Sequence, residues 1–225
     1  MFGLSRRRNR IAEQYLAGNG IEIGALQNPL KVPTGVQVTY VDRMGNADLF
    51  KHYPELSGHK LVPVDVIDDG EILATIDRSS QDFIIANHFL EHCQNPIGAL
   101  AVWAQRLKPR GTAYIAIPDM RFSFDHRRPP TPWAHLLDDY NGETNQSRHA
   151  HYREWTRLVL GVPELQVDAV AEDLMNRDYS IHFHTWTATS FREFLSNCTK
   201  DLGFPLGLRA FIRNGGEIIA ILIKK

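Results

Sequence analysis

Two short, apolar runs separated by a helical pattern constrain the fold of this chain most. The runs extend from Phe83 to Ala86 and from Thr112 to Ile117. Between them, apolar residues recur at helical spacing from Ile97 to Leu107, and Pro109 and Gly111 end the pattern. A strand, a helix and a second strand in this order form a right-handed crossover between parallel strands. Because strands that are apolar on both faces are typical of a sheet covered on both sides, the sequence predicts an α/β fold.

Five more apolar segments of strand length lie outside this unit, three before it and two after it. The last two flank Asn214 and Gly215, and an Asn-Gly pair between apolar runs is the strongest short-range signal of a β-hairpin. We therefore predict a mostly parallel sheet that ends in an antiparallel hairpin. The five segments are residues 20–24, 37–41, 60–64, 206–212 and 217–223.

The region at residues 119–185 has no strand pattern. Helical spacing of apolar residues is visible over residues 133–140 and 149–159. The region is too poor in aliphatic residues to form the core of a separate domain. We therefore predict a single domain over residues 1–225 with a mainly helical insertion after the fifth strand. The next helix is expected to have its N-cap at Thr189–Ser190, with Glu193 placed for a capping box.

The charge balance argues against nucleic acid as the main partner. The chain has 225 residues, with 25 Lys and Arg against 26 Asp and Glu, and a net charge of -1. We read the basic run from Arg6 to Arg10 as a solvated helix turn. No apolar run approaches the ~20 residues of a membrane span. The first residues lack the pattern of a signal peptide, and Cys93 and Cys198 are too few for a disulfide scaffold, so we expect a cytoplasmic protein.

Polar residues follow the predicted parallel strands in succession. Ligands of an open parallel sheet bind outside the carboxyl ends of its strands. A carboxylate at Asp42 could accept hydrogen bonds from both ribose hydroxyls, and Asp65 could accept one from an exocyclic amine. The strand ends therefore suit a nucleoside. The residues in question are Glu22, Gly24, Asp42, Asp65, Asn87 and His88.

The order of these motifs resembles that of the class I S-adenosylmethionine-dependent methyltransferases. The similar segments are Glu22-Ile23-Gly24, Val41-Asp42, Val64-Asp65-Val66, residues 82–92 (DFIIANHFLEH) and Leu107-Lys108-Pro109-Arg110-Gly111. The resemblance covers residues 19–118 and the terminal hairpin, and it implies a Rossmann-like sheet. The chain departs from the family pattern E-x-G-x-G-x-G, because Leu26 and Asn28 stand at the positions of its second and third glycines. The methionine end of the cofactor is therefore expected to be held differently.

The resemblance also implies roles for residues at the cofactor, S-adenosylmethionine. Glu22 and Gly24 would line its methionine portion, and Asn87 and His88 would lie beneath the sulfonium and face the substrate. The insertion would then cap the substrate side. The remaining implied cofactor-binding residues are Asp42 at the ribose, Arg43 and Met44 beside the adenine, and Asp65 and Val66 at the adenine edge.

Six of the 10 histidines lie between His126 and His184, and transfer to a hydroxyl would use a general base. The candidates are His88, His149, His151, His182 and His184. His182 and His184 are two residues apart on an extended segment, so they could point to the same side and hold a divalent metal with Asp138 or Asp139. A polar network or substrate contacts are the alternatives for these histidines.

The insertion is dense in side chains that recognise hydroxylated or anionic molecules. We expect a small polar acceptor, a hydroxyl of a sugar, glycan or natural-product intermediate. Two alternatives stay open. One is a non-catalytic binding protein with the same fold. The other is a protein that binds another nucleotide, such as a dinucleotide, and the absence of G-x-G-x-x-G after the first strand argues against it. The sequence leaves the oligomeric state open. The candidate substrate-binding residues are His135, Asp139, Tyr140, Arg148, His149 and Tyr152.

Overall fold

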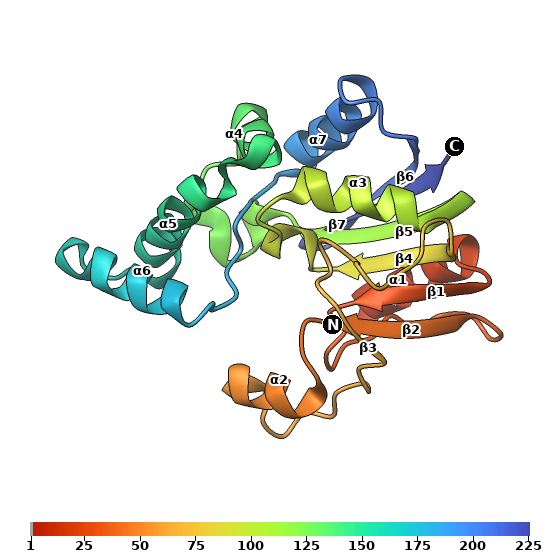
Figure 1. Ribbon diagram of the computed structural model, residues 1–225, viewed down its shortest axis with the longest axis horizontal. Coiled ribbons are helices and arrows are strands. Elements are labelled where there is room, and N and C mark those ends of the chain that lie inside the picture. The colour runs from red at the N-terminus through yellow and green to blue at the C-terminus, as the bar shows by residue number, and fades with distance from the viewer. Residues whose placement is uncertain (1) are drawn as a thin grey trace.

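Across residues 2–225, which the computed structural model describes, the chain forms a seven-stranded sheet in the order β3-β2-β1-β4-β5-β7-β6 (Figure 1). Strands β1 to β5 pair in parallel, and β7 pairs antiparallel with both β5 and β6. The expectation of a Rossmann-like, mostly parallel sheet with a terminal hairpin is therefore confirmed. The strands are β1 (Asn19–Ile23), β2 (Gln37–Asp42), β3 (Val66–Ile67), β4 (Gln81–Asn87), β5 (Leu107–Pro118), β6 (Leu206–Asn214) and β7 (Glu217–Lys224).

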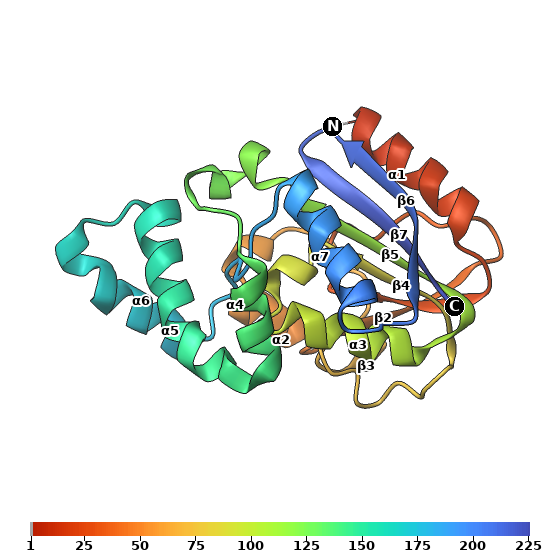
Figure 2. The same cartoon turned by 90° about the horizontal axis from the view of Figure 1, so that it is seen from above.

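Helices cover both faces of this sheet (Figure 2). Alternate residues of a strand point to opposite faces, and β4 shows the consequence. Its Ile84 packs in one apolar core with helices α3 and α7, whereas Phe83 and Ile85 pack in the other with α1. This is why the strand is apolar at every central position. The helices that cover the sheet are α1 (Phe2–Tyr15), α3 (Pro96–Arg106) and α7 (Ala188–Lys200), whereas α2 (Asn46–His52) packs in a separate small cluster.

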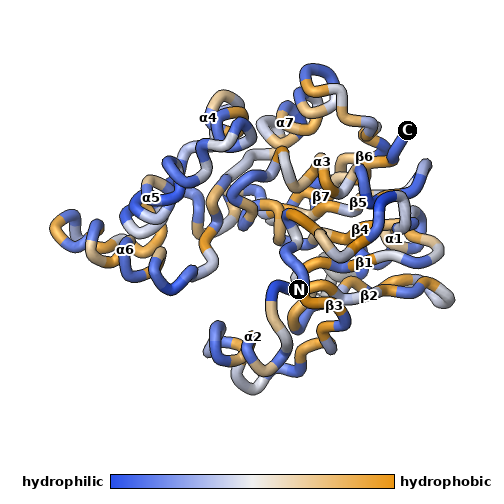
Figure 3. The backbone as a smooth tube through the Cα atoms, in the orientation of Figure 1, coloured by the Kyte–Doolittle hydropathy of each residue, from blue (hydrophilic) through white to orange (hydrophobic). Residues whose placement is uncertain are grey.

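The insertion projects beside the sheet as a group of helices (Figure 1). Hydrophobic residues concentrate in the strands, whereas α5 is largely hydrophilic (Figure 3). The insertion nevertheless buries a small apolar cluster that includes Tyr152, Trp155 and Leu174, which the composition did not lead us to expect. Its helices are α4 (Trp133–Asp138), α5 (Thr144–Trp155) and α6 (Val167–Asn176), with π-helical turns at Asp139–Glu143 and Thr156–Leu160.

The third strand differs from its prediction. It is only Val66–Ile67, after Asp65 rather than before it. The segment at residues 60–64 makes other contacts, because the Val62 N–H bonds the carbonyl of Leu26 and the Val64 N–H bonds the side chain of Asn46. Residues 60–64 therefore form no strand.

The start of α7 also differs. Its N-cap is Thr187, whose hydroxyl accepts from the Ser190 N–H, while the Ser190 hydroxyl accepts from the Thr187 N–H. Thr189 and Ser190 lie inside the first turn, so the predicted N-cap was two residues too late. Glu193 was assigned to the capping box, but Ser190 takes that place.

Candidate active site

Two cavities meet at the carboxyl ends of the parallel strands. The first has a volume of about 520 Å³ and lies between β1, β4 and α1. The second has a volume of about 460 Å³ and opens between the loops after β2 and β3 and the insertion. Gly24, Leu26 and His88 line both of them. The two cavities are therefore neighbours at the loops that follow β1 and β4.

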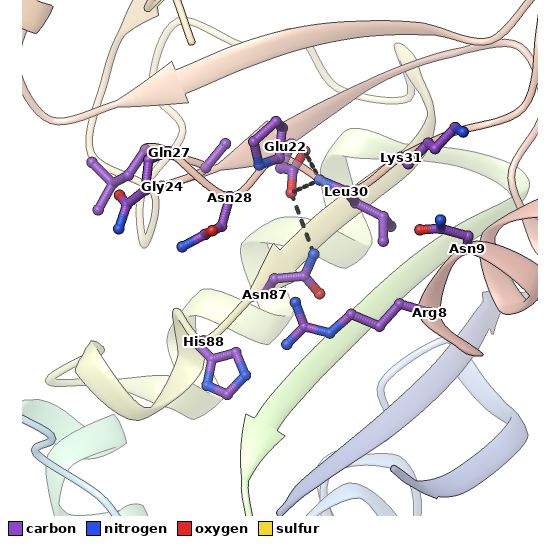
Figure 4. A pocket seen from close by; sticks show the side chains of 13 residues that line it. Arg8, Asn9, Glu22, Gly24, Gln27, Asn28, Leu30, Lys31, Asn87 and His88 are labelled. Atoms are coloured by element: carbon purple, nitrogen blue, oxygen red, sulfur yellow. Dashed lines mark hydrogen bonds between the residues drawn. The ribbon is translucent and has the colours of Figure 1, made fainter. Parts of the chain in front are cut away.

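Glu22 is completely buried beside the first cavity (Figure 4). Its carboxylate accepts hydrogen bonds from the Leu30 N–H at 2.9 and 3.1 Å and from the Asn87 amide at 3.3 Å. Burial raises the pKa of Glu22 to about 7, and these hydrogen bonds oppose the rise. The carboxyl group is consequently only partly ionised at neutral pH.

Two positions around the second cavity favour glycine, one by its backbone conformation and the other by its close neighbours. Gly24 has a φ of +64°, and a Cβ on Gly70 would lie 2.4 Å from side-chain atoms of Ile23 and Phe89. Leu26 stands where the resemblance has its second glycine, and its φ is +48°. The backbone therefore keeps a left-handed conformation there although the glycine is missing, at some cost in strain.

Asp42 ends β2 at the second cavity. Burial raises the pKa of Asp42, and the N–H of Arg43, which donates to its carboxylate at 2.8 Å, opposes the rise. The Arg43 guanidinium reaches across to Tyr53 at 2.8 Å and to Asp178 at 2.7 Å. Asp178 follows α6, so this contact ties the body of the protein to the insertion.

Six of the nine predicted cofactor-binding residues line the cavities: Glu22, Gly24, Asp42, Arg43, Asn87 and His88. The other three do not line either described cavity. Met44 packs against a small apolar cluster formed by Leu49, Leu56 and Leu61. The Asp65 carboxylate accepts a hydrogen bond from the Tyr40 N–H, and Val66 packs against the main core.

The residues after β3 that do line the second cavity are Asp69, Gly70 and Glu71. They were missed because the third strand was predicted to end at Val64, three residues before its end at Ile67. The Asp-Asp-Gly sequence that follows β3 was the signal that could have found them.

His88 lies between two carboxylates. Its Nε2 is 3.0 Å from Glu217 and its Nδ1 is 3.4 Å from Glu91. Arg8 donates to Glu217 as well, from Nε at 2.8 Å. Burial opposes protonation of the imidazole, but the two carboxylates raise the pKa of His88 to about 9. His88 is therefore a cation at neutral pH, which does not suit the role of general base.

Arg8 and Glu217 were missed by sequence reasoning. Arg8 belongs to the run that we read as solvated, yet it lines the first cavity (Figure 4). Burial would raise the pKa of Glu217, but its hydrogen bonds from Arg8 and His88 hold that pKa at about 2. No local signal marks either residue, because they meet only when α1 and β7 pack together.

The predicted catalytic histidines of the insertion do not line the described cavities. His151, His182 and His184 are buried, and Nδ1 of His182 lies 2.6 Å from Asp125. A metal site shared by His182 and His184 was one of the alternatives, but the two residues lie apart. His182 lies near Glu91 and His92, whereas His184 lies near His135, Asp139 and His151.

The six predicted substrate-binding residues also separate. Tyr152 lines the second cavity, and Arg148 donates to Asp178 at 2.8 Å at its rim. Tyr140 lines a third cavity of about 360 Å³, which shares no lining residue with the first two. His149 is exposed, and His135 and Asp139 belong to the histidine cluster around His184.

His92 lines the second cavity although we had given it no role there. Its Nδ1 is 2.9 Å from the carbonyl oxygen of Ile181, and since a carbonyl only accepts, Nδ1 carries the proton. Burial lowers the pKa of His92 to about 4. The ring is therefore neutral at neutral pH, and its lone pair is on Nε2.

A family model described as "Methyltransferase domain" matches residues 17–197, most of the chain and nearly all of the strand ends described above. The chain belongs to this methyltransferase family. No curated protein matches the sequence. Among the described residues of the methyltransferase, no helix is long and apolar enough to cross a membrane.

Solved structures share the fold of the methyltransferase. A SAM-dependent methyltransferase of Methanosarcina mazei is 15% identical, with a TM-score of 0.50 over 94% of this chain and 95% of that chain. A protein in complex with the Haloferax volcanii Trm112 methyltransferase activator is 12% identical, with a TM-score of 0.52 over 99% and 92%. A Rhodobacter sphaeroides protein described as a Zn-dependent alcohol dehydrogenase is 15% identical, with a TM-score of 0.56 over 97% and 89%. At these identities the likeness concerns the fold alone.

S-adenosylmethionine is the cofactor expected of this family, and the residues of the methyltransferase fit it. The side-chain oxygens Gln27 Oε1 and Asn87 Oδ1 are buried without a hydrogen-bond partner among the described residues. Both residues line the first cavity. Buried acceptors without donors are costly, and an ammonium group would satisfy them.

Proposed function

We propose that this methyltransferase moves the methyl group of S-adenosylmethionine to a hydroxyl of a small polar acceptor, a sugar, glycan or natural-product intermediate. The observation that carries the proposal is the position of Asp42, whose carboxylate ends β2 at the second cavity beside Gly24 and His88. A carboxylate there suits the two hydroxyls of a ribose. Asp69 and Gly70, rather than Asp65 and Val66, would then lie at the adenine.

The amino-acid end of the cofactor would extend past Gly24 into the first cavity. Gln27 and Asn87 would accept hydrogen bonds from its ammonium group, and Arg8 would face its carboxylate. This arrangement replaces the missing glycines of the family pattern with side-chain contacts. The bound cofactor supplies an electrophilic methyl group, so the protein mainly aligns the reactants and excludes water.

The acceptor would lie in the second cavity on the side of the insertion. Tyr152, Tyr179 and Ser180 line that side, and they offer aromatic and hydroxyl groups of the kind that bind sugars. His92 is the neutral imidazole at this cavity, so we assign it, rather than His88 or the buried histidines of the insertion, to accept the hydroxyl proton. The cationic His88 would stabilise negative charge that develops on the acceptor oxygen.

The proposal is tested by calorimetric titration with S-adenosylhomocysteine. We expect Asp42→Ala to weaken binding at least ~10-fold, since a carboxylate that accepts from ribose hydroxyls contributes roughly 1.5–3 kcal/mol. Asp48→Ala, which removes an exposed carboxylate of α2, is the matched control and should bind like the wild type.

Three results would contradict the proposal. One is equal affinity of the wild type and Asp42→Ala. Another is preferential binding of NAD in a competition titration, which would favour the dinucleotide alternative. The third is a failure of hydroxylated sugars to stimulate formation of S-adenosylhomocysteine by a protein that binds the cofactor, which would remove the acceptor class.

A further inference from the structure

Four side chains of the insertion direct potential metal ligands at one point. They are His135 of α4, Asp139 of the following π-helical turn, His151 of α5 and His184 of the returning extended segment. Their ligand atoms all lie within 4.8 Å of one another. Residues from three separate segments of the insertion therefore converge at this cluster.

Four of the distances between the ligand atoms scatter around those of a tetrahedral ion. Asp139 Oδ2 is 3.3 Å from His135 Nε2, 3.6 Å from His184 Nε2 and 3.9 Å from His151 Nε2, and the two nitrogens of His135 and His151 are 2.9 Å apart. Bonds of about 2.0–2.1 Å to Zn²⁺ in tetrahedral geometry give ligand separations of about 3.3–3.4 Å. The observed separations lie on both sides of that value.

Three of the four residues are buried, His135 is partly exposed, and the protein satisfies the cluster incompletely. Asp139 and His184 are fully buried, and the three imidazoles near Asp139 Oδ2 form no hydrogen bond of normal geometry with it. The other oxygen of Asp139 accepts from the hydroxyl of Ser147, which fixes the carboxylate in place. A polar network explains the contact between His135 and His151, but it leaves a buried carboxylate oxygen without a well-formed hydrogen bond.

The chemistry of the four groups indicates which ion fits. Imidazole nitrogen with one carboxylate oxygen is a donor set for zinc, and four protein ligands leave no position for a substrate or water. Nε2 of His184 also lies 3.2 Å from the carbonyl oxygen of Gln94, a contact that it would exchange for the ion. Gln94 lines the second cavity, so the cluster stands directly behind the cavity wall.

We propose that His135, Asp139, His151 and His184 bind one Zn²⁺ ion as a closed structural centre of the insertion. The insertion buries only a small apolar cluster, and a metal ion commonly compensates for a small core. The ion would join α4 and α5 to the segment at residues 181–186, which returns along the body of the protein. This centre takes no part in methyl transfer.

Metal content and cobalt spectroscopy test this proposal. The protein is stripped with a chelator, incubated with Zn²⁺, separated from free ion and analysed by mass spectrometry for zinc. We expect about one bound ion per chain and a rise in the melting temperature. Incubation with Co²⁺ in place of zinc should give the intense visible absorption of a tetrahedral site. Hydrogen exchange should slow over residues 133–155 on zinc binding.

Variants assign the ion to these ligands. Asp139→Asn and His151→Ala should lose the bound zinc, whereas His126→Ala, which removes an exposed histidine of the same insertion, should retain it. Circular dichroism of the variants shows whether they fold. The proposal is overturned if the folded wild type retains no zinc, if the cobalt spectrum is octahedral, or if the variants Asp139→Asn and His151→Ala retain zinc as His126→Ala does. None of these measurements depends on cofactor binding.

Discussion

His88 combines an unfavourable backbone with favourable charge contacts. Its φ is +51°, a left-handed conformation that a β-carbon disfavours, and its ring lies between Glu91 and Glu217. Such strain persists only where surrounding contacts hold the residue, and it is commonest at functional sites. The pairing with two carboxylates therefore fixes both the position and the charge of this imidazole.

The raised pKa of His88 predicts a pH dependence of stability. The pKa is about 9 in the folded chain against 6.5 unperturbed, so its contribution is complete below pH 6.5 and is lost as the pH rises through 9. The ring is 41% exposed, and solvent screening limits the pH-dependent part to about 1 kcal/mol. Urea unfolding of the wild type and His88→Gln should therefore show a difference in free energy that shrinks by this amount from acidic to alkaline pH. His59→Gln, at an exposed histidine, should show no such change.

The sequence predicted those site residues that belong to local patterns. Asp42 and Asn87 follow apolar strands, and a strand end can be located from the run of residues before it. Arg8 and Glu217 are 209 residues apart, and their contact depends on how α1 packs against the terminal hairpin. The charge of His88 could not be predicted for the same reason, because its pKa depends on contact with Glu217, which is distant in the sequence.

Among the elements, β3 and α7 show why boundaries were harder to predict than the presence of the long strands. Residues 60–64 have apolar character, but the side chain of Asn46 and the loop after β1 take their backbone groups. The long strands, in contrast, follow from apolar runs that are buried on both faces of the sheet. Element boundaries depend on individual hydrogen bonds, for which the sequence offers several equivalent donors and acceptors.

The N-cap of α7 provides a direct test at this scale. Thr187→Ala removes an acceptor for the Ser190 N–H and should lower the free energy of unfolding by about 1 kcal/mol. Thr189→Ala removes the same atoms from an exposed position within the first turn and should change it by less than ~0.5 kcal/mol. Chemical denaturation of both variants measures the difference. Equal losses would show that the helix does not begin at Thr187.

At the scale of the whole molecule, Asp178 joins the insertion to the body. It accepts from Arg43 at 2.7 Å and from Arg148 at 2.8 Å, beside the opening of the second cavity. Its side chain is 56% exposed, so the two ion pairs contribute little to overall stability. Their position indicates a different role, which is to hold the insertion against the loop after β2.

We expect Asp178→Asn to raise the dissociation rate of S-adenosylhomocysteine roughly three- to ten-fold, which corresponds to about 1 kcal/mol. The free energy of unfolding should change by less than ~0.5 kcal/mol. Stopped-flow dissociation and urea unfolding measure the two quantities. Asp173→Asn, which removes an exposed ion pair with Arg177 on α6, should leave the dissociation rate unchanged. An unaltered rate in Asp178→Asn would mean that the insertion does not depend on this contact.

The two edges of the sheet offer little for another molecule to pair with. The β3 edge is two residues long, and the outer strand β6 is interrupted by an irregularity between Leu208 and Ala210. The exposed Arg209 and Arg213 add positive charge along that strand. Short, irregular and charged edges resist the strand-to-strand addition that leads to aggregates. A strand from another molecule would therefore meet a very short ladder at one margin and an irregular, positively charged one at the other.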